Sequence, residues 1–328
     1  MEILYENLLH ISWQQIVMWI IGGVLIYLAI KKEMEPTLLL PIGFGAILVN
    51  LPLSGAITRY FQGETAISQA AYNKLLAEGA TDISVEEGAL TTLFEAGIAN
   101  ELFPLILFIG IGAMIDFGPL LSNPKLMIFG AAAQFGIFFT LCAASMFFGI
   151  DDAASIAIIG AADGPTSIVV ANKLGSNYLG AIMVAAYSYM ALIPVIQPPI
   201  MKILTTEKER KVEMKQLRKV SKTEKIIFPV AVLILCALLL PSVAPLLGML
   251  MLGNLFKECG VTERLSETAQ NALMNIVTIM LGVTVGATAN GQDFLQLKTV
   301  LIIGLGLLAF CFSTMGGVLF GKLLYVVT

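Results

Sequence analysis

The chain has 328 residues, of which 57% are hydrophobic and only 13% are charged, and its mean hydropathy is +0.87. A soluble domain carries about 25% charged residues, and one aqueous core cannot bury this much apolar surface, so an integral membrane protein is predicted. The net charge of −4 argues against nucleic-acid binding, and a single histidine, His10, excludes a histidine-rich zinc site. The four cysteines form no CxxC pair and are interpreted as free.

Windows without Asp, Glu, Lys or Arg predict the membrane spans, because one crossing needs about 20 apolar residues. The window 226–256 is too long for one span, and Pro241 and Pro245 at its centre predict a hairpin of two short helices. The charge-free windows are 7–30, 36–58, 126–150, 174–201, 226–256, 268–292 and 299–321.

The charges beside these windows predict their orientation. Segment 202–225 carries nine of the nineteen basic residues against four glutamates, so it is expected in the cytoplasm. Glu2 and Glu6 precede the first window and Lys31 and Lys32 follow it, which favours an outside N-terminus and argues against a cleavable signal peptide.

Two further apolar runs, 102–121 and 153–172, contain one acid each. If every apolar segment before residue 202 crossed the membrane, the basic segment would lie outside. One of them must therefore enter and leave by the same face. We predict that this segment is 153–172, because Asp163 is followed directly by Gly164 and Pro165, which break a helix. A hairpin at 36–53 is the alternative that would also place the basic segment inside.

The chain also contains a weak internal similarity. Residues 38–48 resemble 246–256, and 112–130 resemble 286–304 at one common offset. A repeat with an odd number of spans in each half would be inverted, as in many secondary transporters, and it would place a partner of 153–172 near the C-terminus. The predicted fold is thus an all-α, inverted-repeat polytopic bundle, divided into a first membrane repeat 1–201, a basic cytoplasmic loop 202–225 and an incomplete second repeat 226–328.

The stretch 160–167, GAADGPTS, carries the clearest chemistry. A carboxylate at membrane depth costs about 2.5–3.5 kcal/mol on insertion scales, so Asp163 calls for a functional reason. Unwound carbonyls, the Asp163 carboxylate and the hydroxyls of Thr166 and Ser167 would form an oxygen cluster, which suits a small hard cation. The alternative is a kinked helix in which Asp163 only caps the N-terminus of a half-helix.

Other polar positions allow two interpretations each. Tyr187, in the sequence Tyr187-Ser188-Tyr189, lies deep in a charge-free window and could donate a proton, or it could be an ordinary packed aromatic residue. Asp116 could be a second cation ligand, although its position favours an interfacial cap. Asp151 and Asp152 suit either a helix cap or an ion-attracting mouth.

Taken together, seven blocks in order closely resemble the β subunit of the sodium-translocating, biotin-dependent decarboxylases, a family that acts on oxaloacetate, methylmalonyl-CoA, glutaconyl-CoA or malonate. The resemblance extends over essentially the whole chain. The blocks are PIGFGAILVN (41–50), GAMIDFGPLLSNPK (112–125), GAAAQFGIF (130–138), GAADGPTSI (160–168), AAYSYMALIPVIQPPIM (185–201), LTTEKERK (204–211) and NIVTIMLGVTVGA (275–287).

This resemblance implies a membrane subunit that decarboxylates carboxybiotin and exports Na+ across the bacterial cytoplasmic membrane. It implies that Asp163 is the central sodium ligand on a broken helix, assisted by Thr166 and Ser167, and that Tyr187 handles protons and ions. The implied partners are a carboxyltransferase α subunit with its biotin carrier, a small membrane γ subunit and further β copies in the bilayer. No covalent biotin is expected on this chain.

Family members usually continue further and carry a second broken-helix motif, so the resemblance predicts that a shortened product or a second polypeptide accounts for the missing segment. The competing function is a secondary sodium-coupled carboxylate transporter or Na+/H+ antiporter, which would share the broken helix but need no biotin. A non-catalytic membrane anchor is a third alternative, and it would leave Asp163 unexplained.

Overall fold

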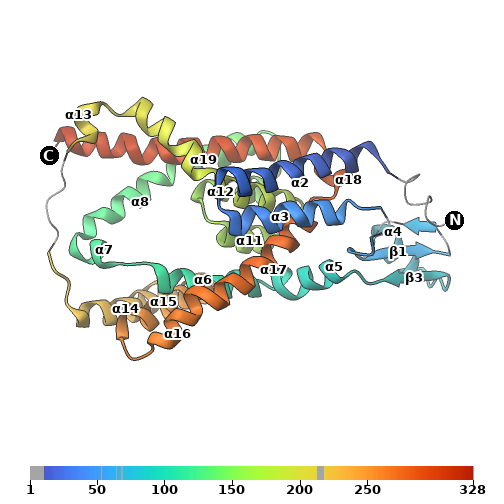
Figure 1. Cartoon of the computed structure of the whole chain (residues 1–328), viewed down its shortest axis with the longest axis horizontal. Helices are drawn as coiled ribbons and strands as arrows, with labels where there is room; N and C mark the ends of the chain where they lie inside the picture. Colours follow the sequence, from blue (N-terminus) through green and yellow to red (C-terminus); the bar gives the residue numbers. More distant parts are fainter. Residues whose placement is uncertain (1–10, 53, 64, 68, 213–217, 328) are drawn as a thin grey trace. The chain divides into compact units, whose positions relative to one another are not determined.

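The computed structural model describes residues 11–52, 54–63, 65–67, 69–212 and 218–327, so His10 and Lys215 lie outside the described part (Figure 1). Contacts divide the chain into two compact units. The first consists of Met1–Asn100 and Ile279–Gln296, and the second of Glu101–Thr278 and Leu297–Thr328.

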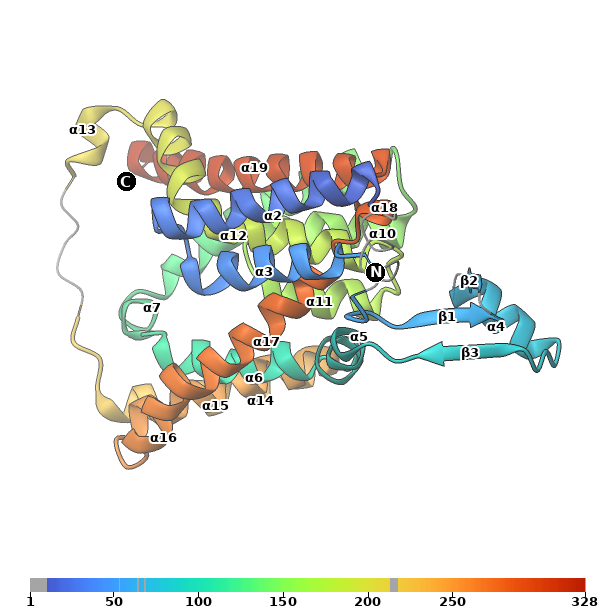
Figure 2. The same ribbon diagram turned by 45° about the vertical axis from the view of Figure 1, so that its right-hand side comes forward.

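The first unit combines an α-helical hairpin with a small antiparallel sheet of strand order β2-β1-β3, and α4 packs on that sheet (Figure 2). Sequence analysis did not predict this sheet. The elements of the unit are α2 (Trp13–Lys32), α3 (Pro36–Val49), β1 (Arg59–Gln62), β2 (Thr65–Ile67), α4 (Gln69–Ala77), β3 (Ile83–Glu86), α5 (Ala89–Phe94), the π-helix η1 (Glu95–Ala99), most of α17 (Met274–Ala287) and α18 (Gly291–Phe294).

The described residues of the second unit form helices and the loops between them, without a strand, and α19 runs beside both α9 and α12. Its elements are α6 (Leu102–Met114), α7 (Gly118–Ser122), η2 (Pro124–Leu126), α8 (Met127–Ala133), α9 (Phe135–Ala144), α10 (Ile150–Ala157), η3 (Ile158–Ala161), α11 (Gly164–Lys173), α12 (Leu179–Leu204), α13 (Glu207–Arg210), α14 (Lys222–Leu239), η4 (Pro241–Val243), α15 (Ala244–Cys259), α16 (Glu263–Thr268), the π-helix η5 (Ala269–Leu273), the start of α17, and α19 (Leu297–Val327).

Five helical segments are long and apolar enough to cross a membrane, which confirms an all-α, multi-pass membrane protein. A sixth candidate is α5–η1 with α6, interrupted at Glu101, and α3 is a shorter apolar helix. The predicted hairpin at 226–256 is confirmed as α14 and α15, which pack together and are joined through η4. The five segments are Trp13–Lys32, Pro124–Ala144, Leu179–Leu204, Glu263–Ala287 and Leu297–Tyr325.

The two helical hairpins begin in the same way. The Ser12 hydroxyl accepts a hydrogen bond from the Gln15 N–H, and the Gln15 side chain accepts from the Ser12 N–H. Ser221 and Glu224 form the same reciprocal pair at the start of α14. Each pair satisfies two N–H groups that a helix leaves free, so both helices begin where the sequence supplies a capping box.

Glycine contacts support the internal repeat. In the second unit, α15 and α6 cross with Gly253 against the backbone of Ile109 and Gly112 against that of Leu250. A β-carbon on either glycine would overlap the opposing carbonyl oxygen. Such close approach of two backbones is what small residues permit in membrane helices.

In the first unit, α3 and α17 cross with Gly45 against the backbone of Val283 and Gly286 against that of Ile42. Each α3 residue is 208 positions before its counterpart in α15, and each α17 residue is 174 positions after its counterpart in α6. The π-helices η1 and η5 are also 174 positions apart. The same helix crossing therefore occurs twice, within each unit separately.

Segment 153–172 folds back on itself, as the prediction of a re-entrant segment requires. Near the start of α10, the Asp152 carboxylate accepts hydrogen bonds from the Ser176 hydroxyl at 2.8 Å and the Asn177 N–H at 3.0 Å, both in the loop after α11. The start of α10 and the end of α11 are thus adjacent, so the two helices form a hairpin and α12 follows from the end at which α10 begins.

A charge cluster joins α14 to the ends of α6 and α15. The Lys225 ammonium donates to Asp116 at 3.2 Å and pairs with Glu258 at 3.4 Å. Asp116 also accepts from the N–H of Gly118, the first residue of α7, at 2.9 Å, although the N-cap of α7 is Phe117 and Asp116 lies one residue before it. That backbone hydrogen bond, assisted by Lys225, lowers the pKa of Asp116. Partial burial alone would lower the pKa of Lys225, but Asp116 and Glu258 outweigh burial and raise it.

Replacing Lys225 with methionine is expected to lower the free energy of unfolding by about 1–2 kcal/mol, between the values for exposed and buried ion pairs. The Glu258 side chain is only 12% exposed and would lose its partner, whereas Asp116 is 56% exposed and would be screened by water. Unfolding in an SDS titration would measure the loss, with the exposed Lys222→Met as control.

The pH dependence of this loss follows from the two pKa shifts. A raised pKa means that the Lys225 contribution is complete below the model-peptide value of 10.5 and disappears as the pH rises through the folded-state value. A lowered pKa means that the Asp116 contribution is complete above 3.8 and disappears as the pH falls. The deficit of the variant should therefore be constant at neutral pH, and a deficit that changes steeply there would contradict this assignment.

Candidate functional site

The predicted broken helix is present at residues 158–163. The helix α10 tightens into the 3₁₀ segment η3, and the backbone then enters the left-handed region at Ala162, where φ is +58°. Asp163 is extended and forms the N-cap of α11. Gly164 and Pro165 occupy the first turn of α11, where proline is tolerated because its missing N–H is not needed. The break therefore presents a carboxylate between two half-helices.

Three of the predicted site residues are brought together at this break. The Asp163 carboxylate accepts hydrogen bonds from the Thr166 hydroxyl and, at 3.3 Å, from the Thr166 N–H. The Ser167 hydroxyl donates to the Asp163 backbone carbonyl at 2.9 Å. Asp163 therefore does cap the half-helix, as the simpler interpretation required. Both hydroxyls donate their hydrogen to an oxygen of Asp163, so their own oxygen lone pairs remain available to a cation.

Tyr187 lies against the same turn. Its ring packs on Gly164, where a β-carbon would lie 2.6 Å from Cε1 and from Cζ, so only glycine fits between Asp163 and Pro165. Tyr187 is fully buried. Of the buried side chains in the described residues, only Tyr187 and Thr140 have hydroxyls without a hydrogen-bond partner. Burying a phenol hydroxyl without a hydrogen-bond partner costs free energy, so Tyr187 is a candidate for a functional role and not only for packing.

Helix α19 also contacts the break. The Ser313 hydroxyl donates to the Gly160 carbonyl at 2.8 Å, and the Tyr189 hydroxyl donates to the Ile303 carbonyl. Sequence analysis did not single out Ser313. The only local signal was a serine within the charge-free window 299–321.

The remaining acids do not join the broken helix. Asp116 is held by Lys225 and Gly118. The N-cap of α10 is Gly149, so Asp151 and Asp152 lie in its first turn and neither caps it. Asp152 instead ties the loop after α11 to α10.

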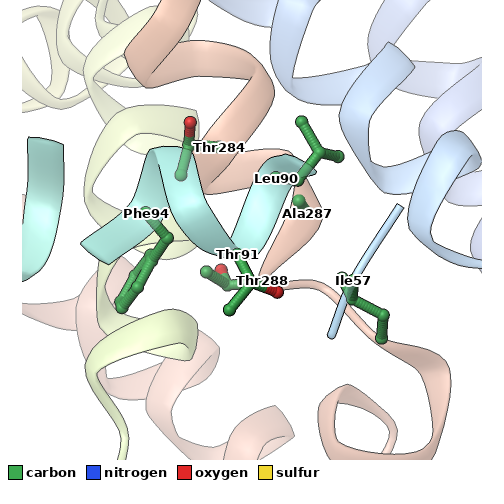
Figure 3. A pocket seen from close by; sticks show the side chains of 7 residues that line it. All are labelled: Ile57, Leu90, Thr91, Phe94, Thr284, Ala287 and Thr288. Atoms are coloured by element: carbon green, nitrogen blue, oxygen red, sulfur yellow. The ribbon is translucent and has the colours of Figure 1, made fainter. Parts of the chain in front are cut away.

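A separate cavity of about 140 Å³ occurs within the first unit (Figure 3). Its hydroxyls are already engaged, since Thr91 accepts from the Thr58 N–H, Thr284 donates to the Met280 carbonyl and Thr288 to the Val285 carbonyl. It contains no charged side chain and none of the predicted site residues, which makes it a poor cation site. The lining residues are Ile57, Leu90, Thr91, Phe94, Thr284, Ala287 and Thr288.

Comparison with known proteins gives consistent matches. Residues 14–328 match the family described as Na+-transporting oxaloacetate decarboxylase beta subunit. Over 312 residues the chain is 54% identical to methylmalonyl-CoA decarboxylase subunit beta of Propionigenium modestum, which covers 94% of this chain and 77% of that protein. In an alignment of 355 positions it is 48% identical to the oxaloacetate decarboxylase beta chain of Klebsiella pneumoniae, and the alignment covers 98% of this chain and 82% of that protein.

A third relative has another named substrate. The chain is 50% identical over 314 residues to glutaconyl-CoA decarboxylase subunit beta of Acidaminococcus fermentans, which covers 95% of this chain and 76% of that protein. The relatives thus differ in substrate but share the name of beta subunit. The chain belongs to the family of Na+-transporting oxaloacetate decarboxylase beta subunits, the membrane subunits of sodium-pumping decarboxylases.

Proposed function

We propose that this chain decarboxylates carboxybiotin presented by a partner subunit and couples that reaction to Na+ export across the bacterial cytoplasmic membrane. The observation that carries the proposal is the Asp163 carboxylate at a re-entrant helix break, beside the buried Tyr187 hydroxyl that has no partner among the described residues. The partner subunit would recognise the acid or acyl-CoA that is consumed, consistent with the different substrates in the names of the relatives.

The Asp163 site is suited to Na+ by its ligand chemistry. A carboxylate and the Thr166 and Ser167 hydroxyls offer only oxygen atoms, which small hard cations prefer. Loss of CO2 from carboxybiotin requires a proton on the biotin nitrogen. A proton and Na+ would compete for the Asp163 carboxylate, so proton uptake from outside can be coupled to outward release of Na+. Tyr187 would carry that proton, a role supported by the contact of its ring with Gly164, the residue after Asp163.

The basic segment 202–225 would guide the anionic carboxybiotin and its carboxyltransferase to the cytoplasmic face. Its first part is anchored: the Arg210 guanidinium donates to the Thr205 carbonyl, and Lys322 pairs with Glu209 at 3.4 Å and donates to the Leu204 carbonyl at 3.0 Å. Anchoring would hold the segment near the ends of α12 and α19. The same proposal includes a small membrane γ subunit and further β copies as partners. It also includes the division of the chain into a first membrane repeat, 1–201, and a second, 226–328.

The direct test is ²²Na+ uptake by inside-out vesicles that contain the assembled complex. Uptake driven by the decarboxylation substrate should stop when avidin binds the biotin carrier. Streptavidin already saturated with biotin is the matched control and should have no effect. Avidin-insensitive Na+ uptake would instead support a secondary transporter or antiporter.

Replacing Tyr187 with phenylalanine removes one oxygen atom and preserves the packing on Gly164, so the protein should fold normally. We expect decarboxylation-driven Na+ uptake to fall by about 10²–10⁴-fold, the range for loss of a proton-transfer group. Tyr189→Phe is the comparison, because its hydroxyl is occupied by the Ile303 carbonyl. If Tyr189→Phe loses uptake and Tyr187→Phe does not, the role belongs to Tyr189.

A further inference from the structure

A side-chain hydrogen bond from α19 holds the broken helix at the carbonyl of Gly160. In a continuous helix this carbonyl would accept from the N–H four residues on, at Gly164. The left-handed backbone at Ala162, where φ is +58°, interrupts this pattern, and the Ala162 N–H bonds to the Ile159 carbonyl at 3.1 Å. The Ser313 hydroxyl instead donates to the Gly160 carbonyl at 2.8 Å.

Helix packing leaves little freedom at this contact. A β-carbon on Gly136 of α9 would overlap Ser313, and one on Gly160 would lie 3.3 Å from the Ser313 Oγ and 3.1 Å from the Ala309 Cβ. Three helical elements thus meet at one serine between two glycines. A larger residue at either glycine position would push α19 away from the break, so the contact depends on small residues on both sides.

The hydroxyl of the next residue, Thr314, bonds within α19 itself. Thr314 donates to the Phe310 carbonyl one turn back in its own helix, at 3.0 Å. Ser313 and Thr314 are adjacent hydroxyl residues of α19, but only Ser313 connects α19 to the unwound segment.

We infer that Ser313 is a positioning residue for the cation site: it fixes the unwound segment 158–163 by holding the Gly160 carbonyl on α19. This inference rests on the proposed Na+ site at Asp163. With the tether in place, the site is already ordered when the ion arrives, so binding does not incur the cost of ordering it. Without it, the Gly160 carbonyl is released and the segment samples several conformations.

The experiment is a Na+ titration of the thermal stability of the full chain in detergent, with KCl to keep ionic strength constant. Ser313→Ala should raise the Na+ concentration that gives half-maximal stabilisation by about two- to tenfold, the equivalent of one hydrogen bond. Thr314→Ala should leave that concentration unchanged. The melting temperature in KCl alone reports any purely structural loss and is measured in parallel.

The outcomes separate this inference from the proposed function. A lower melting temperature in KCl with an unchanged half-maximal Na+ concentration would make Ser313 a structural residue only and would overturn the inference, as would tighter Na+ binding. If the wild type shows no response to Na+, the proposed ion site fails. Amide hydrogen exchange of residues 157–164 in KCl then still tests the tether: faster exchange in Ser313→Ala alone supports it, and equal exchange contradicts it.

Discussion

Replacing Asp163 with asparagine is expected to abolish stabilisation of the protein by Na+ and, in the complex, Na+-dependent decarboxylation. The substitution removes the charge but preserves the cap, because asparagine is as good an N-cap as aspartate and its side-chain oxygen can still accept from the Thr166 N–H. The fold should therefore survive. A ligand present at 100 times its dissociation constant stabilises a protein by about 2.7 kcal/mol, so the wild-type response is large enough to measure.

The measurement is thermal unfolding of the detergent-purified protein against NaCl, with KCl at matching ionic strength. Asp116→Asn is the control, since the same chemical change is made where the carboxylate is held by Lys225 and Gly118. That variant is expected to lose some stability in both salts but to keep its response to Na+. Sodium pumping by Asp163→Asn at the wild-type level would disprove the proposed site.

The position of the break was predictable because its signals are local. Asp163, Gly164 and Pro165 are adjacent in sequence, and proline fixes the backbone wherever it occurs. The need for one segment that does not cross followed from the distribution of charges, and its position followed from Gly164 and Pro165; the contacts of Asp152 show the hairpin that such a segment requires. The hairpin at 226–256 followed from Pro241 and Pro245 in the same way.

The contacts that complete the site were not predictable, because they join residues far apart in sequence. Ser313 and Gly160 are separated by 153 positions. No hydrophobic period or charge pattern marks which serine of an apolar helix faces a neighbouring carbonyl. The unpaired state of the Tyr187 hydroxyl likewise depends on what surrounds it in three dimensions. The small sheet was missed because its strands are only three or four residues long and lie in a polar segment.

The glycines of the internal repeat also show that sequence alone does not reveal which residues make contacts. The similarity between 112–130 and 286–304 pairs Gly112 with Gly286 and Gly130 with Gly304 on equal terms. In the structure the first pair lies at helix crossings, whereas a β-carbon on Gly130 or Gly304 would meet no atom within 4 Å in the described part of the chain. Sequence similarity indicated a repeat but did not distinguish packing glycines from exposed ones.

That distinction predicts a large difference in stability. Gly253→Ala should destabilise the protein by about 3 kcal/mol or more, at or above the upper end of the usual cost of overpacking, because the new methyl group would overlap the Ile109 carbonyl oxygen. The obstruction is helix backbone, so no side-chain rotation can relieve it. Gly304→Ala should be neutral or stabilising by up to about 1 kcal/mol, because alanine is the better helix former.

Unfolding of both variants in an SDS titration would measure this difference, and the repeat supplies a second, independent comparison. Gly45 occupies the position equivalent to Gly253, against the Val283 carbonyl, and Gly45→Ala should be destabilising for the same reason. If Gly253→Ala and Gly304→Ala have equal stability, the crossing of α6 and α15 is looser than the structure shows. If only one of Gly45→Ala and Gly253→Ala is destabilising, the two crossings are not equivalent, and the structural support for a repeat would be lost.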